Sequence, residues 1–177
     1  MTSTTPPEQK TRRMATSEEV RALAHPLRLR VIRLLYDGPR TNKELAERLG
    51  ENPATMLHHV RTLLRTGFVA LDSERAGPRG RTEKLYRTTG KSWQLDVDAG
   101  LPAADRLTRA SLDAFLAELH DAGERADLST ARLALVLSPE RRVQLEQRLF
   151  ALLNDFADDE PEDGEQLAVF VAIHHRS

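Results

Sequence analysis

Apolar residues recur at helical spacing near the start of the chain. The i, i+3, i+4, i+7 pattern of a buried helix face runs through Val20, Leu23, Ala24, Leu27, Val31, Leu34 and Leu35. Pro26 lies inside this pattern, and a proline in a helix interior costs about 3 kcal/mol. The pattern therefore predicts two helices, the first capped by Ser17 and the second beginning at Pro26.

Two further helices follow with almost no chain between them. Thr41 begins a capping box because Glu44 lies three positions on, and Gly50 is a natural C-terminal cap. Only one residue separates Gly50 from Asn52, a strong N-cap, and Pro53 takes the first helical position. So short a connection makes the two helices cross sharply, which predicts a helix-turn-helix.

The second helix of this pair is amphipathic. Its apolar face carries Met56, Val60, Leu63 and Leu64. At about 100° per residue, the opposite face carries Ala54, His58, Arg61 and Arg65. A strand then begins at Phe68, residues 73–81 (SERAGPRGR) form a turn, and residues 84–87 predict the returning strand. This hairpin predicts a wing beside the helix-turn-helix.

The second half of the chain predicts two longer helices and two strands. The first helix, over residues 103–122, has an apolar stripe of Leu107, Leu112, Phe115, Leu116 and Leu119. Residues 132–137 predict a buried strand, and Ser138 and Pro139 then begin a helix that ends at about residue 156. Residues 167–173 predict a second strand, so the tail forms a small strand-helix-strand unit.

Charge divides the chain near its middle. The overall net charge is −1, but residues 1–91 hold 18 Lys and Arg against 10 Asp and Glu, whereas residues 92–177 hold 8 against 17. The two halves therefore carry +8 and −9. A basic half joined to an acidic half indicates that the first half alone binds a polyanion. A chance imbalance between two solvated surfaces is the alternative.

Composition argues against several classes of protein. The absence of cysteine excludes disulfides, zinc-thiolate sites and thiol switches. No apolar run approaches the roughly 18 residues that span a membrane, and the N-terminal residues 1–13 lack the apolar core of a signal peptide. We therefore expect a cytoplasmic protein without a membrane partner.

Neither a catalytic nor a metal-binding constellation stands out. The GPRGR turn (residues 77–81) lacks the strand-to-helix context of a phosphate-cradling loop, and no Ser/His/Asp order or paired carboxylates are recognisable. The acidic residues 158–165 lack the ligand spacing of a calcium loop. His174 and His175, adjacent on a predicted strand, point to opposite faces. We therefore expect no enzyme, metal or cofactor site.

Three ordered segments resemble the ArsR-type winged-helix transcriptional regulators. They are ALAHPLRLRVIRLL (residues 22–35), TNKELAERLG (41–50) and ATMLHHVRTLLRTGFV (54–69). The resemblance covers roughly residues 17–95. Regulators of this type are typically homodimers that bind an operator in double-stranded DNA and often release it on sensing a ligand.

This resemblance implies a recognition helix over residues 53–66 and a wing tip over residues 72–82. The chain departs from the family at Leu57, where a serine often precedes the histidine that His59 matches; a leucine there can still touch a thymine methyl. The metal sensors of the family use cysteines, or Asp/His pairs on a C-terminal helix. This chain has no cysteine, and residues 103–122 contain a single histidine, His120. The resemblance therefore implies a regulator that is not a minimal metal sensor.

Eleven residues are candidate DNA contacts. Arginines in a wing suit phosphates or the minor groove, and residues near the start of a recognition helix reach base edges. The candidates are Thr41, Lys43, Asn52, Thr55, His58, Arg61, Arg65, Arg75, Arg79, Arg81 and Lys84. A solvated basic surface is the alternative for the charged members, and Asn52 has a competing role as an N-cap. We expect His59 to be a half-buried packing residue rather than a base reader.

The predicted fold class is α+β and mostly α. A disordered arm over residues 1–16 precedes a winged helix-turn-helix DNA-binding domain over 17–95, and residues 96–177 form an acidic region for dimerisation or an effector. The predicted function is a homodimeric repressor of a pseudo-palindromic operator, with dimer contacts from residues 17–24 and 103–122. The alternative is a winged helix repurposed as a protein-protein interaction module.

A small-molecule effector is a further expectation that the sequence leaves open. Phe115, Leu116 and Leu119, with the strands over residues 133–137 and 167–173, either line a pocket for an unidentified effector or form dimer interface and core. We favour interface and core, because an aromatic content of 5% argues against a stacking cage.

Overall fold

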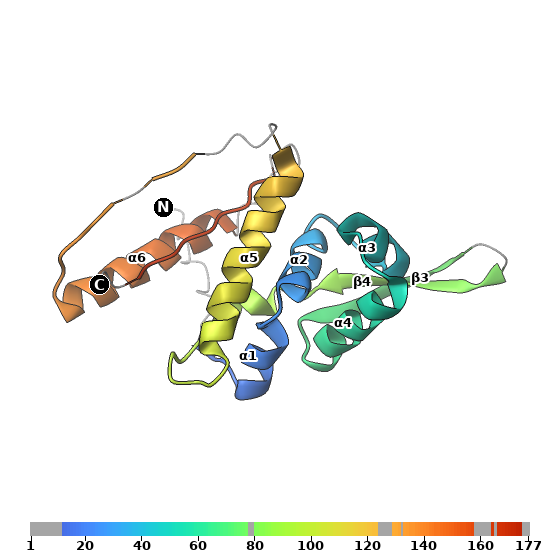
Figure 1. The fold of residues 1–177 in the computed structure, drawn as a ribbon, viewed down its shortest axis with the longest axis horizontal. Helices are drawn as coiled ribbons and strands as arrows, with labels where there is room; N and C mark the ends of the chain where they lie inside the picture. The colour runs from blue at the N-terminus through green and yellow to red at the C-terminus, as the bar shows by residue number, and fades with distance from the viewer. Residues whose placement is uncertain are drawn as a thin grey trace, which may run out of the picture. The chain divides into compact units, whose positions relative to one another are not determined.

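The computed structural model describes residues 12–77, 80–123, 129–131, 133–157, 164 and 166–174. Residues 12–125 form one compact unit, and residues from 126 onward belong to a second (Figure 1). The helix after the wing is thus part of the first unit, although the expected domain boundary lay before it, at residue 96. The functional division at that boundary stays a prediction.

Helices dominate both units, and small sheets complete the first, as expected for a mostly α member of the α+β class. The helices are α1 (Ser17–Leu23), α2 (Pro26–Leu34), α3 (Asn42–Leu49), α4 (Pro53–Arg65), α5 (Ala104–Ala122) and α6 (Pro139–Ala157), with a 3-10 turn η2 (Lys91–Gln94). The strands are β1 (Arg13–Met14), β2 (Arg40–Thr41), β3 (Val69–Ala76), β4 (Thr82–Thr88) and β5 (Leu95–Asp96). Within the described residues, no helix is long and apolar enough to cross a bilayer.

The wing is an antiparallel hairpin that extends a short sheet. Strand order is β2-β4-β3, with Arg40 opposite Tyr86 and Val69 opposite Thr88. The register shifts between Leu71 and Ser73, which increases the twist of the outer hairpin. The hairpin formed by β3 and β4 projects beyond α3 and α4 (Figure 1). The predicted winged helix-turn-helix is confirmed.

The residues just before α1 correct one expectation. The disordered arm was expected to reach residue 16, but Arg13 and Met14 pair in parallel with Leu95 and Asp96. Residues 1–11 lie outside the described residues. This pairing explains why residues 13 and 14 are ordered, because it satisfies backbone N–H and C=O groups that would otherwise bond to water.

The helix caps agree with the sequence except at the first helix. Thr16, not Ser17, is the N-cap of α1, and it forms a capping box with Glu19. The box explains the one-residue shift, because only Thr16 has a glutamate three positions on. Pro26 begins α2 as predicted, and the His25 side chain caps it by accepting the Leu27 N–H.

The core of the first unit lies where α1, α2, α3, α4 and the base of the wing meet. Its fully buried side chains are Val20, Val31, Leu45, Met56, Val60, Leu63 and Phe68. The helix α5 packs against α1 and α2 through small residues, Ala110 and Ala114. The stripe predicted for this helix is only partly buried, because Leu112 and Leu116 remain 46% and 54% exposed.

The second unit corrects the expected strand-helix-strand arrangement. Its helix α6 is formed, but residues 133–138 and 166–174 carry no strand. Both segments are apolar and open to solvent, and Val136 is 101% exposed. A strand needs a neighbour to take its backbone hydrogen bonds, and the described residues of one chain do not supply one. Apolar sequence alone therefore overpredicted these two strands.

Candidate nucleic-acid interface

A left-handed glycine and a side-chain hydrogen bond fix the turn between α3 and α4. Gly50 ends α3 with a left-handed φ of 66°, a conformation that glycine adopts without strain. The Asn42 side-chain amide donates to the Pro53 carbonyl at 2.9 Å. This bond ties the first residue of α3 to the first residue of α4. The local sequence thus fixes the helix-turn-helix geometry.

The two faces of α4 differ as the sequence predicts. Met56, Val60 and Leu63 are fully buried. The opposite face is exposed and carries Ala54, His58, Arg61 and Arg65. Because the apolar face anchors the helix, the polar face is presented to solvent as a rigid ridge.

The start of α4 exposes two of the predicted base-reading residues. Asn52 and Thr55 are both exposed. The Asn52 side-chain oxygen accepts the Ala54 N–H at 2.8 Å, so its role as an N-cap is realised. The cap uses only the side-chain oxygen, so the amide group of Asn52 keeps its two N–H donors for a base.

Thr41 and Lys43, the two candidate DNA contacts at the start of α3, differ in how available their side chains are. Thr41 is only 4% exposed, and its hydroxyl both accepts the Glu44 N–H at 3.2 Å and donates to the Glu44 carboxylate at 3.0 Å. The capping box therefore occupies the Thr41 side chain, which leaves no hydroxyl donor for a phosphate. Lys43 is exposed and lies 3.6 Å from Glu47, an ion pair of the weak surface kind.

Arg75 of the wing is held by two carboxylates. Its guanidinium donates to Glu44 at 2.7 Å and to Glu83 at 3.0 Å. These hydrogen bonds raise the pKa of Arg75, and the backbone N–H of Thr41 together with Arg75 lowers the pKa of Glu44 to about 2. The contact with Glu44 joins the wing to α3. Sequence reasoning missed it, because the partners are 31 residues apart.

The rest of the wing is also less positive than its arginine content indicates. Lys84 lies 3.9 Å from Glu74, and Arg87 lies 3.8 Å from Asp72. Arg81 is exposed and has no ion pair within the described part of the chain. Arg79 lies outside the described residues. The cations that remain open for a phosphate are therefore fewer than the sequence alone indicates.

Three histidines, His25, His58 and His59, form a cluster that includes one residue of the polar ridge, His58. His59 is 8% exposed, and its ring centroid lies 4.5 Å from that of His25 and 5.6 Å from that of His58. Burial, followed by the charges of its neighbours, lowers the pKa of His59 to about 4. His59 packs as predicted but is buried rather than half-buried, and the low pKa keeps its imidazole neutral at physiological pH.

Sequence analysis missed a buried carboxylate, Glu19, which is connected to the end of α4 through Lys91. Glu19 accepts hydrogen bonds from Arg13 at 2.6 Å and from the Thr16 N–H at 2.8 Å, and it pairs with Lys91 at 2.6 Å. Lys91 also donates to the Thr66 carbonyl at the end of α4. The network links α1, the end of α4 and the residues after the wing. Only the capping-box spacing of Thr16 and Glu19 could have indicated it.

Comparison with known proteins gives one family match. A family model described as a helix-turn-helix domain matches residues 23–72. The search of curated proteins gave no match. Solved structures that align with the chain are distant in sequence and have low TM-scores. Wild-type Lactococcus lactis ZitR in complex with DNA is 17% identical, covering 88% of this chain and 83% of that chain with a TM-score of 0.29.

Two further alignments are of the same quality. A mutant of Lactococcus lactis ZitR in complex with DNA is 18% identical over 73% of each chain, with a TM-score of 0.32. The adhesin competence repressor AdcR of Streptococcus pyogenes is 12% identical, covering 81% of this chain and 83% of that chain, with a TM-score of 0.29. The fold and the helix-turn-helix match together define a winged helix-turn-helix protein.

Proposed function

We propose that the protein is an ArsR-type transcriptional repressor that binds a pseudo-palindromic operator as a homodimer. In this proposal α4 enters the major groove of double-stranded DNA, and the wing lies against the neighbouring backbone. Two-fold symmetry places the two recognition helices about 34 Å apart, in successive major grooves.

The exposed ridge of α4 is the observation that carries this proposal. His58, Arg61 and Arg65 stand outside the core on a helix whose other face is fully buried. Two short helices joined at Gly50 present this ridge, and nothing in the winged-helix core requires it to be basic. A helix that displays hydrogen-bonding and cationic groups in this way suits a major groove.

The residues of the interface divide by chemistry. We assign base contacts to Asn52, Thr55, His58 and Arg61, since they lie on the ridge or at its N-terminal end. The phosphate contacts are assigned to Lys43, Arg65, Arg75, Arg79, Arg81 and Lys84. We do not assign Thr41 a contact, because its side chain belongs to the cap of α3.

The homodimer is supported by apolar side chains that the first unit leaves open. Leu112 and Leu116 lie one helical turn apart on α5 and are both exposed. Their positions differ from those of Ala110 and Ala114, which pack against the rest of the unit. A second copy of α5 would cover them and supply the two-fold axis.

The ion pairs of the wing favour one second candidate, a winged helix that binds another protein. Glu44 and Glu83 on Arg75, and Glu74 near Lys84, neutralise cations that a DNA-binding wing would offer to phosphates. Replacing Arg79 and Arg81 with alanine separates the two functions. The double variant loses function if the protein acts on DNA and keeps it if the wing serves a protein contact.

Genome-wide footprinting of the protein on its own chromosome tests the proposed function. The expected result is a small set of protected sites, each with two half-sites about one helical turn apart. Transcripts beside these sites rise when the protein is removed if it is a repressor. Uniform occupancy without a shared sequence would contradict sequence-specific binding.

A further inference from the structure

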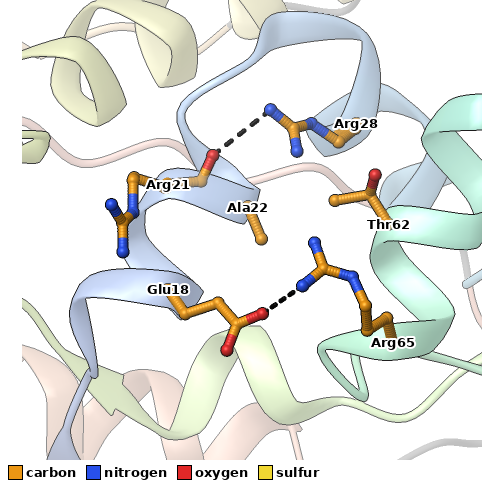
Figure 2. A pocket seen from close by; sticks show the side chains of 6 residues that line it. All are labelled: Glu18, Arg21, Ala22, Arg28, Thr62 and Arg65. Atoms are coloured by element: carbon orange, nitrogen blue, oxygen red, sulfur yellow. Dashed lines mark hydrogen bonds and ion pairs between the residues drawn. The ribbon is translucent and has the colours of Figure 1, made fainter.

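An arginine-lined pocket lies between α1, α2 and the C-terminal half of α4. Its walls are Glu18, Arg21, Ala22, Arg28, Thr62 and Arg65, and its volume is about 310 Å³ (Figure 2). This volume is at the lower end of the range for sites that bind small molecules. None of the residues assigned base contacts lines the pocket, and Arg65 is the one lining residue assigned a phosphate contact.

Three arginines and one glutamate line this pocket, and of the arginines only Arg65 contacts the glutamate carboxylate (Figure 2). Arg65 pairs with Glu18, and both side chains are more than half exposed. Arg21 donates to the Ser17 carbonyl at 3.1 Å, and Arg28 donates to the Arg21 carbonyl at 3.2 Å. Neither Arg21 nor Arg28 pairs with a carboxylate within the described residues. The pocket lining therefore carries a net charge of +2.

Arg28 has a donor with no acceptor. Its Nε is buried and lacks a hydrogen-bond partner within the described structure. Burial also lowers the pKa of Arg28, because a desolvated guanidinium without an anion is destabilised. Arg28 thus carries a charge that no carboxylate within the described residues compensates, and an oxyanion at its outer Nη groups would compensate it.

Glu18 indicates what kind of group this pocket accepts. Its carboxylate is a planar oxyanion that accepts a hydrogen bond from the Arg65 guanidinium (Figure 2). An exposed ion pair of this kind contributes only about 0–1 kcal/mol, so a ligand of higher charge can replace it. A phosphate group offers more acceptor oxygens than a carboxylate and matches the geometry of several arginines.

We propose that this pocket binds the phosphate group of a small anionic ligand, which replaces the Glu18 carboxylate on Arg65. The ligand then bridges Arg21 and Arg28 of the supporting helices to Arg65 and Thr62 of α4. The regulatory consequence rests on the proposed function: a bound phosphate occupies Arg65, one of the assigned DNA contacts, and so weakens operator binding. By linkage, operator DNA weakens phosphate binding by the same factor.

Titration of the full chain with inorganic phosphate and with phenyl phosphate tests the site without DNA. Arginine Nε–H signals in NMR spectra report the pocket directly, and calorimetry gives the affinity at constant ionic strength. Saturable shifts at Arg28 and Arg65 are expected. The Arg21→Ala and Arg28→Lys variants should bind roughly tenfold more weakly, the loss expected for one or two charge-assisted hydrogen bonds.

Matched variants separate the pocket from general electrostatics. Arg109→Ala removes an exposed arginine of α5, outside the pocket, and should leave the affinity unchanged. Glu18→Gln removes the competing carboxylate and should tighten phosphate binding several-fold, whereas Asp105→Asn on α5 should not. Equal effects of the pocket variants and their controls, or shifts that never saturate, would overturn the proposal.

A second arm distinguishes a free anion from a phosphate of the DNA backbone. If the free chain does not bind either probe, while Arg21→Ala lowers the salt dependence of DNA binding by about one ion, the pocket holds a DNA phosphate and the proposal is wrong. Because the first arm uses no DNA, a failure of the proposed function leaves its result interpretable.

Discussion

Glu19 is a buried carboxylate that joins three separate segments of the winged-helix unit. Arg13 lies before α1, Lys91 lies after the wing, and both reach the same side chain at 2.6 Å. The hydrogen bond from Arg13 is the main reason that the pKa of Glu19 is held far below its usual range. Its contribution to stability is therefore present above the unfolded pKa of about 4.3 and is lost as the pH falls below it.

We expect Glu19→Gln to lower the free energy of unfolding by about 2 kcal/mol at neutral pH, because Lys91 loses its carboxylate in a partly buried position. Urea denaturation followed by circular dichroism measures this loss. Glu47→Gln, which removes an exposed partner of Lys43, is the control and should change stability by less than about 0.5 kcal/mol. Equal effects of the two substitutions would show that the network does not stabilise the fold.

His59 makes the same unit sensitive to pH in a higher range. Its pKa is lowered to about 4 in the folded protein, whereas an unfolded histidine titrates near 6.5. The unfolded chain therefore binds a proton first as the pH falls, and the folded state loses relative stability between pH 6.5 and pH 4. Neighbouring His25, whose pKa is also lowered by burial, acts in the same direction.

Between pH 7 and pH 5 the wild-type protein should lose about 2 kcal/mol of stability through His59. His59→Leu places an apolar side chain against His25 and removes the imidazole that titrates at position 59. The unfolding free energy of this variant should therefore change less over the same interval. His120→Leu, at an exposed position of α5, is the matched control and should keep the wild-type dependence. A pH dependence in His59→Leu as large as that of the wild type would assign the effect to other groups.

At the scale of elements, the sequence predicted the helix caps and the turn between α3 and α4, because these depend on interactions between residues close in the chain. The capping box of Thr41 and Glu44, the left-handed Gly50 and the Asn52 cap all lie where the sequence indicates. Residues 167–173 show the opposite case, because an apolar run cannot say whether a strand neighbour exists. Contacts between distant side chains, such as Arg75 with Glu44, have no local signal and could not be predicted.

The recognition helix and the wing should differ in what they contribute to DNA binding. Arg61→Ala removes a ridge cation and should weaken operator binding by about 1–3 kcal/mol while relaxing the preference for the operator. Arg81→Ala should weaken binding to all sequences alike and reduce the salt slope by about one. Fluorescence anisotropy with operator and scrambled duplexes separates the two effects, and identical profiles would contradict the division of roles.

At the scale of the whole molecule, the proposed homodimer needs a surface on which two copies can meet. The apolar pair Leu112 and Leu116 on α5 gives the first unit a surface that one chain does not cover. The functional division of the chain at residue 96 and the role of the acidic half remain predictions. Two-fold symmetry would turn a single recognition helix into a reader of two half-sites.

We expect Leu116→Glu to weaken the dimer at least about tenfold, because a charge would enter an apolar interface. Sedimentation velocity measures the association, and circular dichroism checks that the variant is folded. Leu71→Glu changes another exposed leucine, on β3 of the wing, and should leave the dimer intact. A Leu116→Glu variant that associates like the wild type would place the interface elsewhere.

The affinity for a footprinted operator and for a scrambled duplex of equal length, measured from about 50 to 200 mM salt, tests the central claim most directly. The account predicts that affinity falls steeply with salt for both duplexes. It also predicts that the operator is preferred by about a thousandfold or more, and that Arg61→Ala reduces this preference. Equal affinity for the two duplexes, or binding that is indifferent to salt, would contradict a DNA-reading role for α4 and its wing.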